Sequence, residues 1–298
     1  VMFVLLLAGL PVAYSLGSLG LGMLLAGGFS PLMAPQSILS TLDGFILLAV
    51  PLFLLMSNVL LRGGCGKDLY GAVQAWVGHW PGGLAIATIV SCGIFAAISG
   101  VSVATAATIG VVAIPEMIER GYNKNFVYGL LAAGGTLGIL IPPSVILVIY
   151  AILTEQNIAK LFLAAFIPGI FAAVGYVIAI SIYVRLHPEA AGVKAAVPYA
   201  ERFAALFKVW PVLLVFALVV GGIYQGWFTP TEAAAVAAVY AFLVATFIYR
   251  DMGPLATPEG QPNIPIWRKP QALLTAFVHR DTRDALFQAG KLTITLMF

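Results

Sequence analysis

Long runs of apolar residues, separated by short polar segments, dominate the chain. A helix needs about 20 apolar residues to cross the hydrocarbon core of a bilayer. Six apolar stretches can do so, some of them with the help of tilt. They comprise residues 1–25, 44–61, 126–153, 158–184, 209–225 and 233–249. The first stretch lacks the basic start and the cleavage site of a signal peptide, so we expect it to be a retained span. The pattern predicts an all-α polytopic membrane protein.

A seventh apolar stretch, 82–115, is too long for one ordinary span and is interrupted at Ser99-Gly100. It forms either one strongly tilted helix or a re-entrant hairpin, whose two half-helices enter and leave by the same face. Lys and Arg concentrate in cytoplasmic loops. The hairpin topology places every Lys and Arg except Lys160 on one side, whereas a full crossing would move Arg62 and Lys67 to the other side. We therefore predict the hairpin, with the amino terminus in the cytoplasm.

The predicted topology also suggests an internal repeat. Five spans precede the stretch 233–249, which therefore runs opposite to the first span. The segment 271–298 loosely resembles 36–53, because in both a mixed polar and apolar stretch leads into a span. This is how an inverted repeat begins, a common plan in secondary transporters. We predict a first repeat over 1–225 and the start of a second, truncated repeat over 226–298.

Two amphipathic segments are expected to lie on the membrane surface. One helical face of 67–80 collects five apolar side chains: Leu69, Val73, Trp76, Val77 and Trp80. Such a face, ending in Trp, is typical of a helix in the headgroup layer. The segment 271–286 has a similar pattern, and the proline-rich stretch 253–270 predicts a cytoplasmic loop.

Composition excludes several classes of protein. The chain is 61% hydrophobic and 9% charged, whereas soluble domains carry about 25% charged residues, so the bilayer is the solvent that fits. The net charge of +3 is small and not clustered, which argues against nucleic-acid binding. Cys65 and Cys92 lack metal or redox spacing, and we interpret Cys92 as a small buried packing residue.

Enzymatic chemistry is not expected either. The three histidines lie outside the predicted spans, and the sequence has neither an HExxH motif nor a Walker-type loop. Ser102 follows Gly100-Val101, but a serine nucleophile needs a base within reach. Glu232, after Thr-Pro-Thr, is interpreted as the cap of a helix amino terminus.

Two segments break the rule that backbone inside a membrane is helical. The hairpin tip, 98–110, gathers hydroxyl groups around a glycine: Ser99, Gly100, Ser102, Thr105 and Thr108. The segment 132–144 combines helix-weakening residues near the middle of a span: Gly134, Gly135, Gly138, Pro142 and Pro143. Proline removes a backbone donor and crowds the preceding turn, so the helix should be interrupted there.

Interrupted helices leave carbonyl and N–H groups unpaired, which is tolerable only where they face protein or a water-filled cavity. Sodium binds such carbonyls together with Ser and Thr hydroxyls, and the amino termini of half-helices attract anions. We favour a shared site for sodium and a carboxylate. Two alternatives remain: the small residues could serve only helix packing, with the hydroxyls bonded to their own backbone, and the Gly-Pro segment could be a simple kink.

Five motifs occur in order over nearly the whole chain: SGVSVATAATIG, IPEM, RGY, AAGGTLGILIPPS and GWFTPTEAAAVAAVYA. In order and spacing they resemble the large membrane subunit of tripartite ATP-independent periplasmic (TRAP) transporters. The resemblance implies an inverted-repeat, elevator-type permease of the bacterial inner membrane, with a re-entrant hairpin (about 82–115) and an interrupted helix (about 126–153). It implies sodium-driven import of an organic acid, such as a C4-dicarboxylate or a sialic acid, without an organic cofactor. The implied partners are a periplasmic substrate-binding protein (DctP-type) and a small membrane subunit (DctQ-type).

The resemblance also implies roles for individual residues. Sodium would be held by Ser99, Gly100, Ser102, Gly135, Thr136 and Gly138. The substrate would be bound by Ser102, Thr105, Gly135, Thr136 and Pro143. Many family members have another serine where this chain has Val101, so that position supplies no side-chain oxygen here. The family's second hairpin and second broken helix would lie beyond Phe298, so we expect this chain to hold about half a site and not to transport alone.

Two other functions remain open at this stage. One is a sodium-coupled anion symporter of a related family that works without a binding protein. The other is a passive channel or a membrane scaffold that transports nothing. Transport against a gradient would separate the last from the others, and dependence on a binding protein would separate the two symporters.

Overall fold

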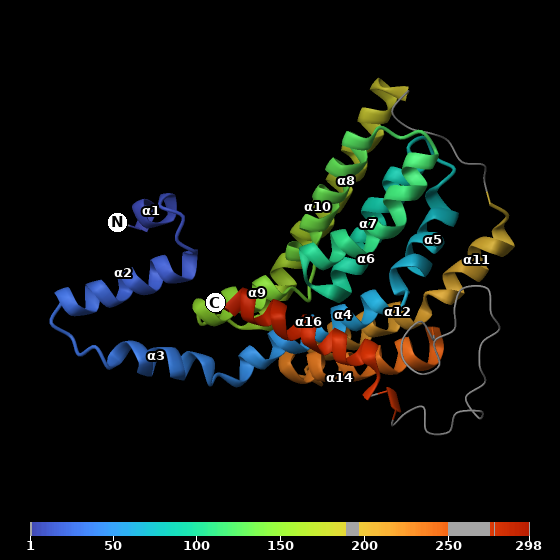
Figure 1. Cartoon of the computed structure of the whole chain (residues 1–298). Helices are drawn as coiled ribbons and strands as arrows, with labels where there is room; N and C mark the ends of the chain where they lie inside the picture. Colours follow the sequence, from blue (N-terminus) through green and yellow to red (C-terminus); the bar gives the residue numbers. More distant parts are fainter. Residues whose placement is uncertain (1, 189–196, 250–274, 277, 298) are drawn as a thin grey trace.

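The computed structural model describes residues 2–188, 197–249, 275–276 and 278–297, and every regular element in these residues is a helix (Figure 1). Four of the described helices are long and apolar enough to cross a membrane, or up to six spans if each of two bent helix pairs counts as one. The prediction of an all-α polytopic membrane protein is confirmed.

The described elements are all helical. In chain order they are α1 (Met2–Leu7), α2 (Val12–Ala26), α3 (Met33–Leu42), η1 (Phe45–Leu48), α4 (Ala49–Arg62), α5 (Cys65–Val77), α6 (Gly83–Ser99), α7 (Ser102–Glu119), α8 (Lys124–Leu140), α9 (Val145–Leu153), α10 (Ile158–Leu186), α11 (Tyr199–Lys208), α12 (Trp210–Phe216), η3 (Ala217–Gly221), α13 (Gly222–Tyr224), α14 (Pro230–Leu243), η4 (Val244–Tyr249) and α16 (Arg280–Met297).

Two groups of helices make up the body of the molecule. The helices α4, α14 and α16 pack side by side, and α6, α7, α8 and α10 form a second bundle (Figure 1). The core of the first group includes Phe53 and Leu60, and that of the second includes Phe95 and Ile109, all almost completely buried.

Three predicted spans appear as continuous apolar helical segments. The stretch 44–61 corresponds to Phe45–Arg62, 158–184 to the 29-residue helix α10, and 233–249 to Pro230–Tyr249. At the start of α14 the hydroxyl of Thr229 accepts from the backbone N–H of Glu232, whose carboxylate accepts in return from the backbone N–H of Thr229. This capping box confirms the interpretation of Glu232.

The stretch 209–225 is helical but not a uniform α-helix. Its middle, η3, is a π-helix of five residues, and the segment is bent by 51° against α11. Only together with α11 does it reach the length and hydropathy of a span. The predicted independent span over 209–225 is therefore too short by itself.

The amino-terminal arm, α1 to α3, extends away from the body (Figure 1). The prediction of one continuous span over 1–25 is wrong. The chain turns between α1 and α2, where Gly9 has a φ of +85° and Pro11 precedes the first residue of α2. Proline cannot continue the preceding helix, and glycine accepts the left-handed conformation at no steric cost. The predicted stretch therefore consists of two helices, of 6 and 15 residues.

The stretch 82–115 is a helical hairpin, as predicted. Helix α6 ends at Gly100, whose φ is +65°, and α7 begins after the extended Val101. The two helices run antiparallel, since the Thr88 hydroxyl near the start of α6 lies 3.5 Å from the Met117 sulfur near the end of α7. The re-entrant course of the hairpin stays a prediction, and so does the cytoplasmic location of the amino terminus.

The predicted interrupted helix is also present. Helices α8 and α9 meet at a bend of 44°, and residues 141–144 between them are not helical. The three glycines named with the prolines, Gly134, Gly135 and Gly138, all lie within α8. The interruption therefore comes from Pro142-Pro143, whose rings cannot support the preceding turn.

The predicted surface segments are only partly described. The segment 67–80 forms most of α5, which packs against α6 and α11 with Leu69 buried, whereas Trp80 lies beyond the end of α5 and is exposed. The described part of 271–286 includes the first turns of α16, which runs along α4. The predicted loop 253–270 lies outside the described residues. The surface location of both segments and the inverted repeat stay predictions.

Candidate ion and substrate site

The hairpin tip is seated directly on the break between α8 and α9. The backbone N–H of Val145 donates to the Gly100 carbonyl oxygen at 3.1 Å. A Cβ atom at Gly100 would lie 2.4 Å from the Pro143 carbonyl oxygen, closer than any van der Waals contact. Glycine is therefore required here twice, for its positive φ and for this close approach.

The first turn of α7 approaches α8 just as closely. A Cβ atom at Gly138 would lie 2.9 Å from the backbone nitrogen of Ser102, and one at Gly135 would lie 3.2 Å from the Ser102 carbonyl oxygen. The glycines of α8 thus let two helix backbones meet, a role that the small-residue packing alternative anticipated. The two predicted segments do come together in space.

Two of the predicted hydroxyl groups face each other inside the tip. The Ser99 and Thr105 hydroxyl oxygens are 2.8 Å apart, and the Thr105 hydroxyl donates to the Val101 carbonyl at 2.9 Å. Both side chains are fully buried. Thr108, one turn further along α7, donates to the Ala104 carbonyl at 2.7 Å. Ser99 and Thr105 therefore form one polar cluster at the tip.

Thr136 points elsewhere. Its hydroxyl donates to the Ala133 carbonyl at 2.6 Å and lies 2.9 Å from the Tyr176 hydroxyl of α10. The structure therefore brings together Ser99, Gly100, Ser102, Thr105, Gly135, Gly138 and Pro143, and directs the Thr136 side chain to α10. The contact with Tyr176 was not predicted, because the two residues are 40 positions apart and no local pattern connects them.

Four helix ends meet at this crossing. The carboxyl ends of α6 and α8 bring carbonyls without a partner in their own helix and partial negative charge, and the amino ends of α7 and α9 bring partial positive charge. Their N-cap residues, Val101 and Ser144, make no side-chain capping hydrogen bond. The carboxyl ends can therefore attract a cation and the amino ends an anion, without any charged side chain.

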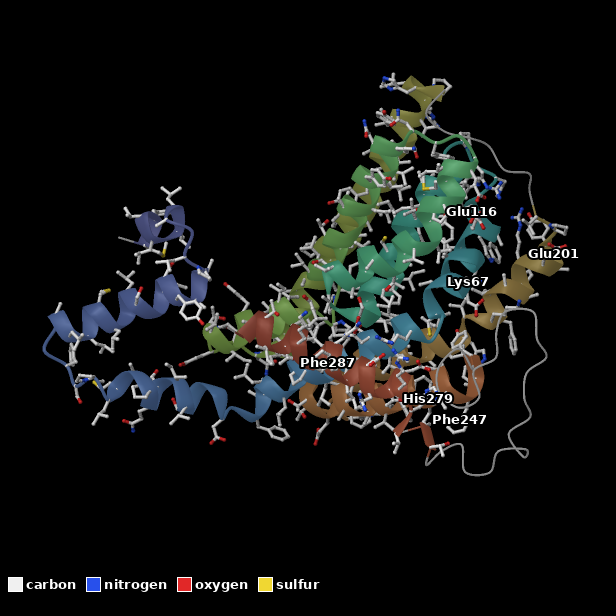
Figure 2. All side chains as sticks on the ribbon, viewed as in Figure 1. Lys67, Glu116, Glu201, Phe247, His279 and Phe287 are labelled. Carbon is white, nitrogen blue, oxygen red and sulfur yellow. The ribbon has the colours of Figure 1, made fainter. Side chains whose placement is uncertain are left out.

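Charged side chains gather at the opposite end of the hairpin. Glu116 lies in the last turn of α7 (Figure 2), where Arg120 Nη2 donates to its Oε1 at 2.9 Å. Gln74 of α5 donates to the same carboxylate oxygen. This network holds α5 against the base of the hairpin, away from the tip.

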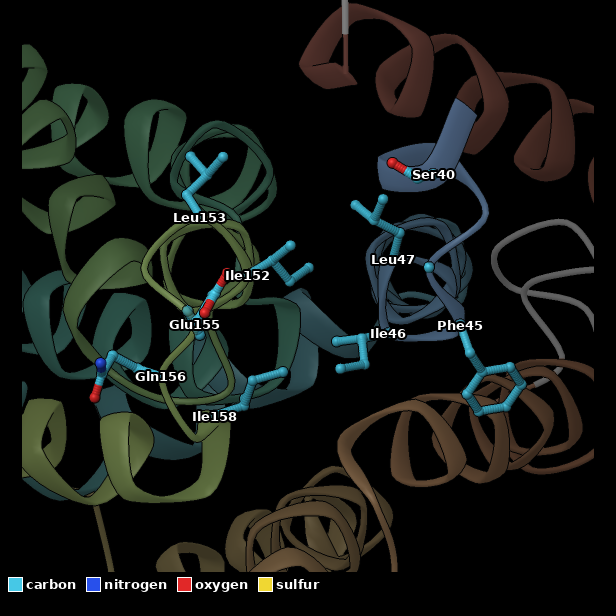
Figure 3. Close-up of a pocket in the computed structure, with 11 residues that line it drawn as sticks. Ser40, Phe45, Ile46, Leu47, Ile152, Leu153, Glu155, Gln156 and Ile158 are labelled. Atoms are coloured by element: carbon cyan, nitrogen blue, oxygen red, sulfur yellow. The ribbon is translucent and has the colours of Figure 1, made fainter. Parts of the chain in front are cut away.

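A cavity of about 710 Å³ lies between the start of the α4 segment and the turn that joins α9 to α10. Figure 3 shows Ile46 and Leu47 on one side and Ile152 and Ile158 on the other. Glu155 at its edge has a φ of +53°. The cavity adjoins the carboxyl end of α9 and is mainly apolar, so it is distinct from the polar crossing at the amino end of α9.

Comparison with known proteins settles the family. A family model described as "Tripartite ATP-independent periplasmic transporter, DctM component" matches residues 1–298. The chain belongs to this family. The recognition based on the five sequence motifs is confirmed.

Several relatives have curated names. The chain is 42% identical over 299 residues to the C4-dicarboxylate TRAP transporter large permease protein DctM of Vibrio cholerae, covering 98% of this chain and 64% of that protein. It is 39% identical over 274 residues to the protein of the same name in Pseudomonas aeruginosa, covering 90% of this chain and 58% of that protein. It is also 34% identical over 249 residues to the sialic acid TRAP transporter large permease protein SiaM of Vibrio cholerae, covering 83% of this chain and 58% of that protein. The chain thus spans less than two thirds of the length of each.

Proposed function

We propose that the whole protein is the large membrane subunit of a TRAP transporter, which imports an organic acid by sodium-driven symport. The observation that carries the proposal is the hairpin tip seated on the break of α8 and α9, with the Val145 N–H bonded to the Gly100 carbonyl. Family membership adds the permease class. The protein would lie in the bacterial inner membrane with its amino terminus in the cytoplasm.

Neutral oxygen atoms suit the transported cation. The carbonyls at the ends of α6 and α8 and the hydroxyls of Ser99 and Ser102 can bind sodium without a permanent charge that would hold it too tightly. Sodium would enter as a coupling ion and leave with each cycle. The amino ends of α7 and α9 would face a carboxylate of the substrate.

The packing supports movement of the hairpin as one unit. Gly135 and Gly138 let α7 pack closely against α8, and Gly100 lets the tip pack closely against Pro143 and Ser144. These contacts tie α6, α7 and α8 to one another, whereas α14 and α16 pack mainly on α4. We infer an elevator mechanism in which α6 to α9 move against the other group as a scaffold.

The proposed partners follow from the family. A periplasmic binding protein would deliver the substrate, and a small membrane subunit would brace the scaffold. The relatives' names mention C4-dicarboxylates and sialic acid, so both are substrates to test first. We expect residues 1–298 alone not to transport, and uptake by this fragment would contradict the half-site interpretation.

The test uses the whole protein and its small subunit in proteoliposomes. We would follow uptake of a labelled C4-dicarboxylate and a labelled sialic acid under an inward sodium gradient, with and without the cognate binding protein. Uptake that requires both sodium and the binding protein supports the proposal. Sodium-driven uptake without the binding protein would indicate the simpler symporter, and uptake of an acid at the same rate with and without the sodium gradient would contradict the proposal.

A further inference from the structure

A groove runs between α8 and α10, which lie side by side (Figure 1). Its volume is about 500 Å³, and its lining is mainly apolar. At one end, which we call the mouth, the rings of Phe126 and Tyr183 stack with their centroids 4.7 Å apart. At the other end the hydroxyl of Tyr176 lies 2.9 Å from that of Thr136. The groove therefore leads from a ring stack at the start of α8 to a hydroxyl pair further along that helix.

Small residues create the hollow between the two helices. Gly129 of α8 and Ala179 of α10 both line the groove, and a Cβ atom added at Gly129 would have no neighbour within 4 Å. From Phe126 to Ala133, which also line it, the helix rises by about 10 Å. The hydrocarbon of one leaflet is about 15 Å thick, half of the whole core. The groove thus has the lining and the length that suit one acyl chain within one leaflet.

The chain around the mouth is basic. The segments 121–128 and 181–188 contain the start of α8 and the end of α10. They include Lys124, Arg185 and His187, and neither segment contains Asp or Glu. His187 extends the ring stack, since its ring centroid lies 4.8 Å from that of the tyrosine one turn earlier. The amino end of α8 adds partial positive charge. The charge at the mouth therefore complements an anionic headgroup.

We propose that this groove binds an anionic phospholipid, with one acyl chain between α8 and α10 and the headgroup near Lys124 and Arg185. Basic pockets between membrane helices on the cytoplasmic side bind anionic lipid headgroups, and the predicted topology places the mouth on that side. The lipid would fill the space that Gly129 and Ala179 leave open and would hold α10 against α8. Its binding depends on the membrane location of the protein and is independent of sodium coupling.

The experiment measures lipid binding to the whole protein with its small subunit, purified in detergent. The melting temperature is recorded over a series of concentrations of phosphatidylglycerol, which is anionic, and of phosphatidylethanolamine with the same acyl chains, which has no net charge. A ligand that binds the folded state raises the melting temperature as its concentration increases. We expect phosphatidylglycerol to act at a concentration roughly tenfold lower, because two basic side chains attract its headgroup. Native mass spectrometry counts the lipids that stay bound.

Two glycines provide a matched pair of variants for the groove. Gly129 lines it, whereas Gly175 of α10 is exposed outside it, and an added Cβ meets no neighbour within 4 Å at either position. Leucine favours a helix over glycine, so neither change should weaken its own helix. For Gly129→Leu we expect the half-maximal lipid concentration to rise roughly tenfold, the loss from displacing two methylene groups of the chain. Gly175→Leu should match the wild type. Should Gly129→Leu fail to fold, Ala179→Leu fills the groove from the other wall, with the same expected loss.

The basic residues of the mouth are tested by charge removal. The double variant Lys124→Gln with Arg185→Gln should lose the roughly tenfold preference for phosphatidylglycerol over phosphatidylethanolamine. A cation is unfavourable at the amino end of a helix, so replacing Lys124 should not destabilise α8. Lys160 lies in the first turn of α10, whereas Arg185 lies in its last turn. Lys160→Gln is therefore the control and should keep the preference.

Three results would overturn the lipid site. They are equal lipid responses of Gly129→Leu and Gly175→Leu, a wild type that responds equally to both lipids, and an unchanged lipid preference in the double variant. If a protein segment filled the groove instead, Gly129→Leu would lower the melting temperature without added lipid whereas Gly175→Leu would not, and this result would also overturn the site. Sodium-driven uptake is measured separately, so a failure of the proposed function would leave lipid binding unaffected.

Discussion

The amino-terminal arm and the hairpin region are both strongly apolar, yet they use apolar residues in opposite ways. In α1 and α2 large side chains such as Phe3, Leu7 and Met23 are exposed, and Ser15 is the buried residue of the two helices. In α6 almost every residue is buried. Where lipid is the solvent, apolar character places a helix in the membrane but does not make it pack.

The difference lies in the small residues. Glycines of the arm such as Gly17, Gly20 and Gly22 have no neighbour within 4 Å of an added Cβ, whereas Gly100, Gly135 and Gly138 face other backbones. Close packing in a membrane requires such small residues at matched positions on two segments. The comparison indicates that glycine composition alone does not identify a packed site, and that a facing partner is needed.

The sharpest test of this comparison replaces one glycine in each region. Gly100 and Gly28 both have positive φ, +65° and +73°, but only Gly100 is crowded. Alanine at either position carries the same backbone strain, about 1 kcal/mol. We expect Gly100→Ala to abolish sodium-driven uptake and Gly28→Ala to retain most of it, both measured in proteoliposomes. Equal loss in the two variants would show that the contact with Pro143 is unimportant.

A second test compares one residue type in the two regions. Phe95 in α6 is fully buried, whereas Phe3 in α1 is 73% exposed. We expect Phe95→Ala to lower the free energy of unfolding by about 3 kcal/mol, because it leaves a cavity in a packed bundle. Phe3→Ala should change it by less than about 0.5 kcal/mol. Denaturant unfolding in detergent measures both, and similar losses would mean that the arm packs against the body.

A third test concerns the hydroxyl groups of the site. Ser102→Ala should raise the sodium concentration for half-maximal uptake by about fivefold, since a neutral oxygen ligand contributes roughly 1 kcal/mol. Ser18→Ala, which removes a hydroxyl bonded to the Ser15 carbonyl in the arm, should leave it unchanged. An unaltered sodium dependence of Ser102→Ala would remove this residue from the site.

Thr136 requires a separate comparison, because its hydroxyl meets Tyr176. We expect Thr136→Ala to weaken sodium activation of uptake more than protein abundance, by about two- to fivefold, the lower part of the range for one lost hydrogen bond. Tyr176→Phe removes the same bond from the other side. If the two variants behave alike, Thr136 acts by positioning α8 on α10. If only Thr136→Ala has an effect, the threonine belongs to the site itself.

The smallest expected effect is a pH dependence at Asp68 of α5. Burial raises the pKa of this carboxyl above its usual value, although Lys208 and Lys67 oppose the change. An acid whose pKa is raised by folding stabilises the protein most at low pH, and that contribution is lost as the pH rises through the folded pKa. The melting temperature of Asp68→Asn should therefore rise relative to that of the wild type as the pH increases above the usual pKa range of a carboxyl group. Parallel pH profiles would show that Asp68 is well solvated.

Much of the fold could be predicted because helix breakers act locally. Gly100 ends α6 and Pro142-Pro143 follows the end of α8, so the hairpin and the interrupted helix could be predicted from the chain itself. Gly9 and Pro11 separate α1 from α2 in the same local way, so the predicted continuous span over 1–25 is wrong. The Thr229–Glu232 capping box was predicted correctly because both partners lie within one turn.

The amino-acid sequence by itself determined the class of protein, the places where helices stop and the residue types available for an ion site. These properties depend on hydropathy and on neighbouring residues. Only the tertiary structure decided that Gly138 faces Ser102 and that Thr136 turns to Tyr176. Such facts depend on how distant helices rotate and approach each other, which is set by packing over the whole bundle and leaves no local pattern in the chain.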